Sequence, residues 1–177
     1  MAERQIHGFI FEEKYIKDNN LIKNDNYTGK PDATCPNTGL AYSLKCTKLG
    51  GSPDMGDLFR AAECNFDFML VVGYYENTSN KTNIIKIDEI FIDHKKLRKL
   101  LEFDYYNELK DWIKNRVKND KSFDKDWKSE CKAWKKVWNR KYPSLRFKRD
   151  SKTQRRMQLN LGNKFWNEQI IKNKILS

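Results

Sequence analysis

The chain has 177 residues, with 35 Lys and Arg against 24 Asp and Glu and a formal net charge of +11. This length suits a single domain with a sizeable core, and no apolar run reaches the ~20 residues needed to span a bilayer. The chain turns polar directly after Met1, and its four cysteines lack zinc-ligand spacing. We therefore expect a cytoplasmic protein with reduced thiols and no membrane partner.

The first half of the chain is predicted to contain two helices and four strands. In chain order these are a helix over residues 3–17, strands over residues 30–34 and 41–47, a helix near residues 55–64, and strands over residues 67–75 and 83–92. The run Phe68-Met69-Leu70-Val71-Val72 is apolar throughout, which predicts a central strand.

The second half is predicted to be mostly helical. Its expected elements are helices at residues 93–101, 105–118, 124–140 and 164–174, with strand-like alternation at residues 145–149. Trp127, Cys131, Trp134 and Trp138 share one face of their helix and are expected to pack in a core. Together the two halves predict an α/β fold with a mixed central sheet flanked by helices and a helix-rich C-terminal half.

The residues between the strands at 30–34 and 41–47 predict a β-hairpin. Pro36, Asn37 and Gly39 are turn-forming residues, and closure near residues 37–38 sets Asp32 opposite residues 43–45. Because successive strand side chains alternate between faces, Ser43 and Lys45 share one face and Leu44 points to the other. A carboxylate, a hydroxyl and an ammonium are therefore expected at one edge of the sheet.

This set of groups suits metal-assisted hydrolysis of a phosphodiester. Mg²⁺ prefers oxygen ligands and keeps several waters, so one or two carboxylates suffice. The cation lowers the pKa of a bound water, and a Lys beside that water can orient it or help to deprotonate it. The spacing between Asp32 and Lys45 is common by chance in chains with this many charges, so it does not identify a site by itself. The flanking segments provide further evidence.

The flanking segments occur in a recognisable order. Residues 4–12 (RQIHGFIFE) form a helical opening, residues 27–32 (YTGKPD) lead into the hairpin with SLKC at 43–46, and residues 56–60 (GDLFR) precede the apolar strand. This order resembles the PD-(D/E)xK nuclease superfamily, and within it small type II restriction endonucleases, including those of viral or virus-like origin. The resemblance covers about the first half of the chain and implies a restriction-endonuclease-like sheet with a catalytic hairpin, in a bacterial or virus-infected cell.

The resemblance also implies roles for individual residues. Asp32 is the central metal ligand, Lys45 the active-site lysine, and the main-chain carbonyl of Leu44 a further ligand. Glu12 supplies the helix-borne carboxylate, with Glu13 as the alternative. The implied cofactor is Mg²⁺, for which Mn²⁺ can substitute.

One position departs from the pattern of the family. Ser43 stands where the family usually has Glu or Asp, although some small restriction enzymes carry a neutral Gln or Asn there. The site then has one negative charge fewer, which weakens cation binding unless Glu12 compensates. The number of metals, one or two, stays open.

The charge is unevenly distributed along the chain. Residues 1–88 contain 10 Lys and Arg against 12 Asp and Glu, whereas residues 89–177 contain 25 against 12. A balanced half beside a strongly basic half suits a protein that must hold a polyanion. We therefore expect residues 1–101 to form a catalytic core and residues 102–177 a basic, helical DNA-binding part of one domain.

The most basic segment spans residues 140–156, with eight Lys and Arg against the single acid Asp150. Arg and Gln read guanine and adenine edges in pairs of hydrogen bonds, while Lys mainly contacts phosphate. Arg60 is expected to contact phosphate near the cut. The other expected DNA contacts are Arg146, Lys148, Arg149, Lys152, Gln154, Arg155 and Arg156.

These expectations describe a Mg²⁺-dependent, sequence-specific endonuclease of double-stranded DNA, acting as a monomer or a homodimer. Two alternatives stay open. One is a repair or recombination nuclease that reads DNA structure on the same fold. The other is a DNA-binding protein whose catalytic site has lapsed at Ser43.

Overall fold

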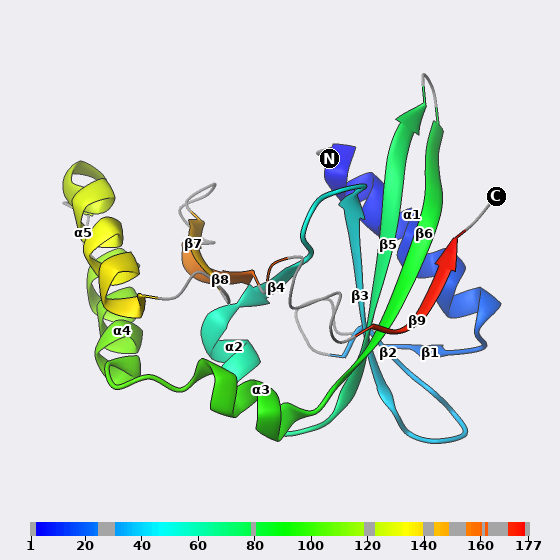
Figure 1. Ribbon diagram of the computed structural model, residues 1–177, viewed down its shortest axis with the longest axis horizontal. Coiled ribbons are helices and arrows are strands. Elements are labelled where there is room, and N and C mark those ends of the chain that lie inside the picture. Colours follow the sequence, from blue (N-terminus) through cyan, green and yellow to red (C-terminus); the bar gives the residue numbers. More distant parts are fainter. Residues whose placement is uncertain are drawn as a thin grey trace. The chain divides into compact units, whose positions relative to one another are not determined.

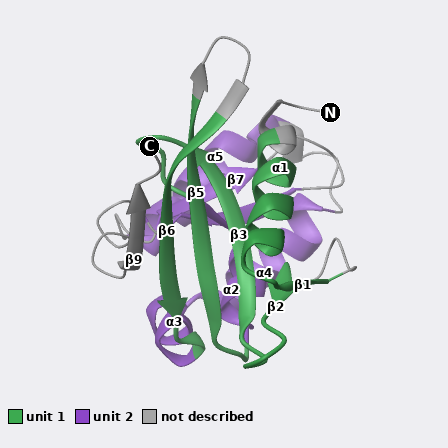
Figure 2. Cartoon of the chain, turned by 90° about the vertical axis from the view of Figure 1, so that its right-hand side faces the viewer, with its two compact units in different colours: residues 1–53, 65–94, 163–177 green, residues 54–64, 95–162 purple. Residues whose placement is uncertain are grey.

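The computed structural model describes residues 3–24, 31–78, 81–118, 123–139, 144–148, 155–160, 162 and 170–175. The chain divides into two compact units whose segments interleave (Figure 2). Unit 1 comprises residues 1–53, 65–94 and 163–177, and unit 2 comprises residues 54–64 and 95–162. The architecture is mixed α/β, which confirms the predicted class.

Unit 1 is a six-stranded mixed sheet with one helix, α1 (Glu3–Asp18), across one of its faces (Figure 1). In spatial order its strands are β1 (Ile22–Lys23), β2 (Ala33–Thr34), β3 (Ala41–Lys48), β5 (Phe68–Thr78), β6 (Lys81–Ile92) and β9 (Ile170–Ile175). β3 and β5 run parallel, and every other neighbouring pair is antiparallel. The predicted β-hairpin is therefore present as β2 and β3.

The sequence of β5 accounts for its central place in the sheet. Leu70, Val71 and Val72 are each 0% exposed, as a strand covered on both faces requires. On the face toward α1, Val71 packs with Leu44 of β3 and with Phe11 of the helix. This packing fixes α1, and with it the adjacent Glu12, against the strand that carries Lys45.

A glycine of β5 makes the close approach of α1 possible. A Cβ built on Gly73 would lie 2.6 Å from the ring of Phe11, whereas a Cβ on Gly8, in α1, would meet nothing within 4 Å. Gly73→Ala is therefore expected to lower the free energy of unfolding by about 1–3 kcal/mol through overpacking. Gly8→Ala is the matched control and should raise it by about 0.5–1 kcal/mol, because glycine is unfavourable inside a helix. Chemical denaturation of both variants measures these changes, and equal effects would argue against this contact.

Unit 2 combines helices with a small antiparallel sheet. Its helices are α2 (Leu58–Ala62), α4 (Tyr106–Trp112), the π-helix η1 (Ile113–Val117) and α5 (Phe123–Trp138), and α3 (His94–Leu101) begins at the boundary between the units. The sheet has the order β4 (Asp54–Asp57), β8 (Arg156–Asn160), β7 (Ser144–Lys148). Cys131 and Trp138 of α5 are each 5% exposed, as the predicted stripe requires. Trp112 meets this helix through a hydrogen bond from its Nε1 to Glu130, 2.8 Å long.

Several elements differ from the prediction, and one of them is strand β1, which was not predicted. The helix expected at residues 164–174 is wrong for residues 170–174, because residues 170–175 form strand β9, which pairs with β6; residues 164–169 lie outside the described residues. Three isoleucines in that segment favour a strand, and β6 offers an open edge with which they pair. The helix expected near residues 55–64 begins only at Leu58 and follows strand β4. Strand β8 was not predicted at all.

The described part of the chain contains no helix that is both long enough and apolar enough to cross a membrane.

Candidate functional site

The hairpin places Asp32 directly before β2 and across from β3. The amide of Asp32 donates to the carbonyl of Tyr42 over 2.8 Å, and the connection closes through a bond from the Cys35 amide to the Leu40 carbonyl. Gly39 has a φ of +70°, the left-handed conformation that glycine adopts without strain. The turn residues thus set the register that brings Asp32 opposite residues 43–45.

One carboxylate oxygen of Asp32 accepts three hydrogen bonds. Oδ2 lies 2.7 Å from the amide of Leu44, 3.2 Å from Oγ of Ser43 and 3.2 Å from Nζ of Lys45. Nζ of Lys45 also donates to the carbonyl of Leu44 over 2.9 Å. Asp32, Ser43, Lys45 and the Leu44 carbonyl therefore come together as the sequence predicts, while the Leu44 side chain packs in the core.

Glu12 joins this group from α1. Burial raises the pKa of Glu12, and the negative charge of Asp32 raises it further, whereas the cations Lys23 and Lys45 lower it. Glu13, the alternative, is exposed. Of the two candidates, Glu12 is thus the carboxylate that interacts with the hairpin.

Lys23 was missed by the sequence reasoning. Its Nζ lies 3.8 Å from Oε1 of Glu12, and it belongs to β1, a strand of two residues at the edge of the sheet. A single Lys in a short polar stretch carries no periodic signal, so only the pairing of β1 with β2 reveals it.

The oxygens of this site fit a hard divalent cation. The carboxylates of Glu12 and Asp32 and the Leu44 carbonyl are the ligand types that Mg²⁺ prefers. Because three donors already occupy Oδ2 of Asp32, its Oδ1 is the atom left for a cation. The charges of Lys23 and Lys45 balance the two carboxylates, which makes a bound cation compete with them.

A buried carboxylate, that of Asp88, lies on the face of the sheet that carries Lys45. Lys45 pairs with Val72, which in turn pairs with Asp88 of β6. Asp88 is 0% exposed, and its Oδ2 accepts from Nζ of Lys86 over 2.8 Å. Burial raises the pKa of Tyr74, and Asp88 raises it further. The ion pair with Lys86 satisfies this acid within the sheet.

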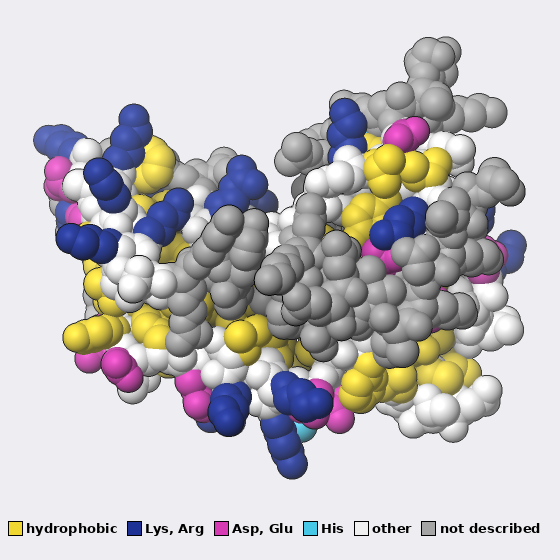
Figure 3. Space-filling model, viewed as in Figure 1, with side chains coloured by type: hydrophobic (Ala, Val, Ile, Leu, Met, Phe, Trp, Pro, Cys, Tyr) yellow, Lys and Arg dark blue, Asp and Glu magenta, His cyan; other side chains and the backbone are white. Residues whose placement is uncertain are grey.

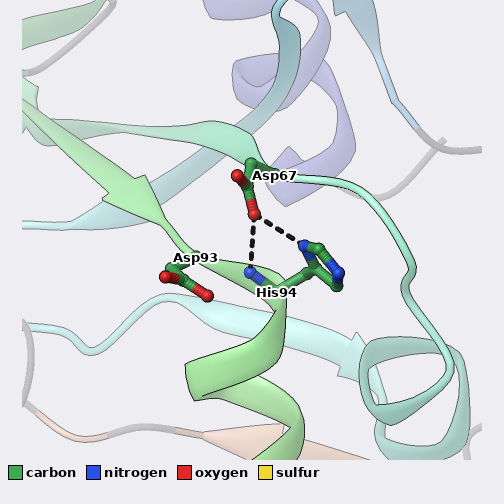
Figure 4. A group of neighbouring side chains, drawn as sticks. All are labelled: Asp67, Asp93 and His94. Carbon is green, nitrogen blue, oxygen red and sulfur yellow. Dashed lines mark hydrogen bonds and ion pairs between the residues drawn. The ribbon is translucent and has the colours of Figure 1, made fainter.

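A third acidic group combines Asp67, Asp93 and His94, whose ligand atoms lie within 4.8 Å of one another. Figure 4 shows Asp67 facing His94, with its Oδ1 accepting from the His94 amide over 3.0 Å and lying 2.7 Å from Nδ1 of the ring. Asp67 thereby holds the first residue of α3. This role explains the cluster without an ion, since the His94 ring would have to leave Asp67 to offer Nδ1 as a ligand.

The residues expected to contact DNA lie in unit 2. Arg60 is exposed on α2, Arg146 is exposed on β7, and Lys148 is partly exposed at the end of that strand. Arg155 and Arg156 are adjacent in the sequence. Nη1 of Arg155 donates a hydrogen bond to the carbonyl of Val117 over 3.3 Å. Three further candidates lie outside the described residues: Arg149, Lys152 and Gln154.

Comparisons with protein-family models, curated proteins and solved structures gave no match. The function of the chain must therefore be argued from its own residues.

Proposed function

We propose that this protein is a Mg²⁺-dependent DNA endonuclease with a restriction-endonuclease-like fold that cuts duplex DNA at a short sequence. The observation that carries the proposal is the meeting of Asp32, Lys45 and the Leu44 carbonyl on one hairpin, with Glu12 added from α1. These groups come from separate segments of the chain, and their proximity supports the proposal.

The chemistry of the site suits phosphodiester hydrolysis. A divalent cation, when bound, supplies a water of lowered pKa and neutralises negative charge on the phosphate. Asp32 Oδ1, Glu12 and the Leu44 carbonyl would hold it. Lys45 can then leave Asp32 and donate a hydrogen bond to a phosphate oxygen or to the attacking water. There its ammonium stabilises developing negative charge. The amide of Leu44 and Oγ of Ser43 keep Asp32 oriented during that exchange.

The charge of the two units supports a polyanionic substrate. Unit 1 contains 12 Lys and Arg against 12 Asp and Glu, while unit 2 contains 23 against 12. The whole net charge of +11 therefore belongs to unit 2. In Figure 3 Lys and Arg side chains gather at the upper left, over α5, where Lys125, Lys128, Lys132, Lys135 and Lys136 are exposed. An excess of cations far beyond what solubility needs favours binding to phosphates.

Digestion of plasmid DNA with Mg²⁺, followed by sequencing of the ends, tests the proposal. Discrete fragments that share a short sequence at the cut are expected. Cleavage of branched or damaged DNA, with no common sequence at the cut ends, would favour a repair or recombination nuclease. Binding with no cleavage in Mg²⁺ or Mn²⁺ would favour a DNA-binding protein whose catalytic site has lapsed.

Ser43 provides a prediction that separates a hydroxyl that only orients Asp32 from one that takes part in the reaction. Ser43 is 2% exposed and donates one of the three hydrogen bonds to Asp32. Ser43→Ala removes a bond worth about 1 kcal/mol, and Asp32 keeps its other two donors. We expect single-turnover cleavage to fall by less than tenfold, since a tenfold change corresponds to about 1.4 kcal/mol. A complete loss, with the thermal midpoint unchanged, would mean that the hydroxyl itself takes part in the reaction.

A further inference from the structure

The small sheet of unit 2 has one apolar and one polar face. In the pairing of β7 with β8, Leu145 lies opposite Leu159 and Phe147 opposite Met157. Leu159 and Met157 are 0% exposed, and the Phe147 ring lies 6.2 Å from that of Trp112. These side chains form the core side of the sheet. Strand alternation sends the residues between them to the opposite side.

The opposite side carries an ordered set of polar side chains. Arg146 of β7 lies opposite Gln158 of β8, and Lys148 lies opposite Arg156. A further row pairs Ser144 with Asn160 and Asn160 with Asp54 of β4. We call this set the polar face; it comprises Asp54, Ser144, Arg146, Lys148, Arg156, Gln158 and Asn160.

The charges of the polar face favour an anionic partner. Burial raises the pKa of Asp54, while a bond from the Gly56 amide and the cations Lys148, Arg156 and Arg146 lower it. Three cations thus surround one acid. Arg146 is exposed, and Lys148 and Arg156 are partly exposed, so all three cations are open to such a partner.

We infer that the polar face reads DNA bases, with Arg146, Gln158 and Arg156 at base edges and Lys148 at phosphate. This inference rests on the proposed function, because it assigns the sequence preference of the same enzyme. The major groove of B-DNA, about 12 Å wide, admits a β-ribbon. Arg pairs with guanine and Gln with adenine through two hydrogen bonds each.

The placement of these side chains on strands supports base reading over phosphate contact alone. Gln158 lies on the central strand, directly opposite the exposed Arg146. Gln158 itself is 7% exposed, so only a small part of its side chain is open to a partner, and its neighbours hold the rest in place, as discrimination between bases requires. Neither Gln158 nor Asn160 stood among the DNA contacts that the sequence predicted, because both lie beyond the basic run.

Two arginines of unit 2 offer a matched pair for the test. Arg156 lies on the polar face, whereas Arg98 is exposed on α3. Arg156→Lys keeps the charge but loses the paired hydrogen bonds to guanine. Arg98→Lys makes the same chemical change outside the polar face.

The experiment selects duplexes from a randomised DNA pool by binding in Ca²⁺, with sequencing of the bound fraction. Wild type, Arg156→Lys, Gln158→Leu and Arg98→Lys are compared, and thermal melting reports on their folding. We expect wild type and Arg98→Lys to enrich the same motif. Arg156→Lys should lose preference at one position by about 5- to 150-fold, and Gln158→Leu should relax a different position.

Several outcomes would overturn the inference: no motif with wild type, an unchanged motif with Arg156→Lys, or equal relaxation with Arg98→Lys. If Gln158→Leu does not fold, the pair of arginine variants still decides the question. Cleavage in Mg²⁺, measured separately, keeps the two proposals apart. Cutting without a motif contradicts base reading alone, and a motif without cutting contradicts the nuclease alone.

Discussion

Replacing Lys45 by alanine is expected to lower the single-turnover rate of DNA cleavage by about 10²–10⁴-fold, while DNA affinity changes little. Lys45 Nζ lies 3.2 Å from Asp32 Oδ2 and 2.9 Å from the Leu44 carbonyl, where its proton-bearing ammonium can act on water or phosphate. Affinity should persist because the net positive charge belongs to unit 2.

Lys48→Ala is the matched control for this variant. Lys48 is exposed at the end of the same strand, so its loss changes the net charge equally without touching the hairpin site. Gel shifts in Ca²⁺ measure affinity, and single-turnover cleavage in Mg²⁺ measures chemistry. Equal cleavage by Lys45→Ala and Lys48→Ala would exclude Lys45 from the reaction.

Glu12→Gln is expected to act in opposite directions on stability and on cleavage. Burial and the charge of Asp32 both disfavour the charged form of Glu12, so the neutral amide should stabilise the metal-free protein at neutral pH by on the order of 1 kcal/mol. The same change removes an oxygen ligand. Mg²⁺ affinity should fall by at least about 10–100-fold, the loss typical of even an outer-sphere partner.

The pH dependence of the stability difference follows from the sign of the pKa shift. The pKa of Glu12 is higher in the folded protein than its ordinary value of 4.5, so protonation favours the folded state. The advantage of Glu12→Gln over wild type should be complete above the folded pKa and disappear as the pH falls toward 4.5. Thermal melting in EDTA between pH 4 and pH 8 measures it. A stability difference between Glu12→Gln and wild type that does not change over this pH range would contradict the raised pKa of Glu12.

The sequence predicts the hairpin site well because its signals are local. Pro36, Asn37 and Gly39 specify the turn, and the period of two along a strand then decides that Ser43 and Lys45 share a face. The structure adds the hydrogen bonds that join them to Asp32. Leu70, Val71 and Val72 likewise identify the central strand by composition alone.

The remaining features depend on contacts between distant segments. Strand β9 forms because β6 offers it an edge more than 80 residues away in sequence, which outweighs any local helical preference. Strand β8 carries Gln158 and begins at the end of the basic segment. The charged residues there made the alternation of polar and apolar side chains along β8 hard to recognise from the sequence. The division into units was equally inaccessible, since residues 54–64 join a segment that begins at residue 95.

The most direct test of the metal-dependent hydrolysis is a Mg²⁺ titration of plasmid cleavage by wild type and by Asp32→Asn. Asp32→Asn keeps the size of the side chain and removes the carboxylate that would hold the cation. We expect wild type to be inactive in EDTA, to regain cleavage as Mg²⁺ is returned, and to saturate, while Asp32→Asn stays inactive throughout. Cleavage by wild type in EDTA, or equal cleavage by Asp32→Asn, would contradict this account.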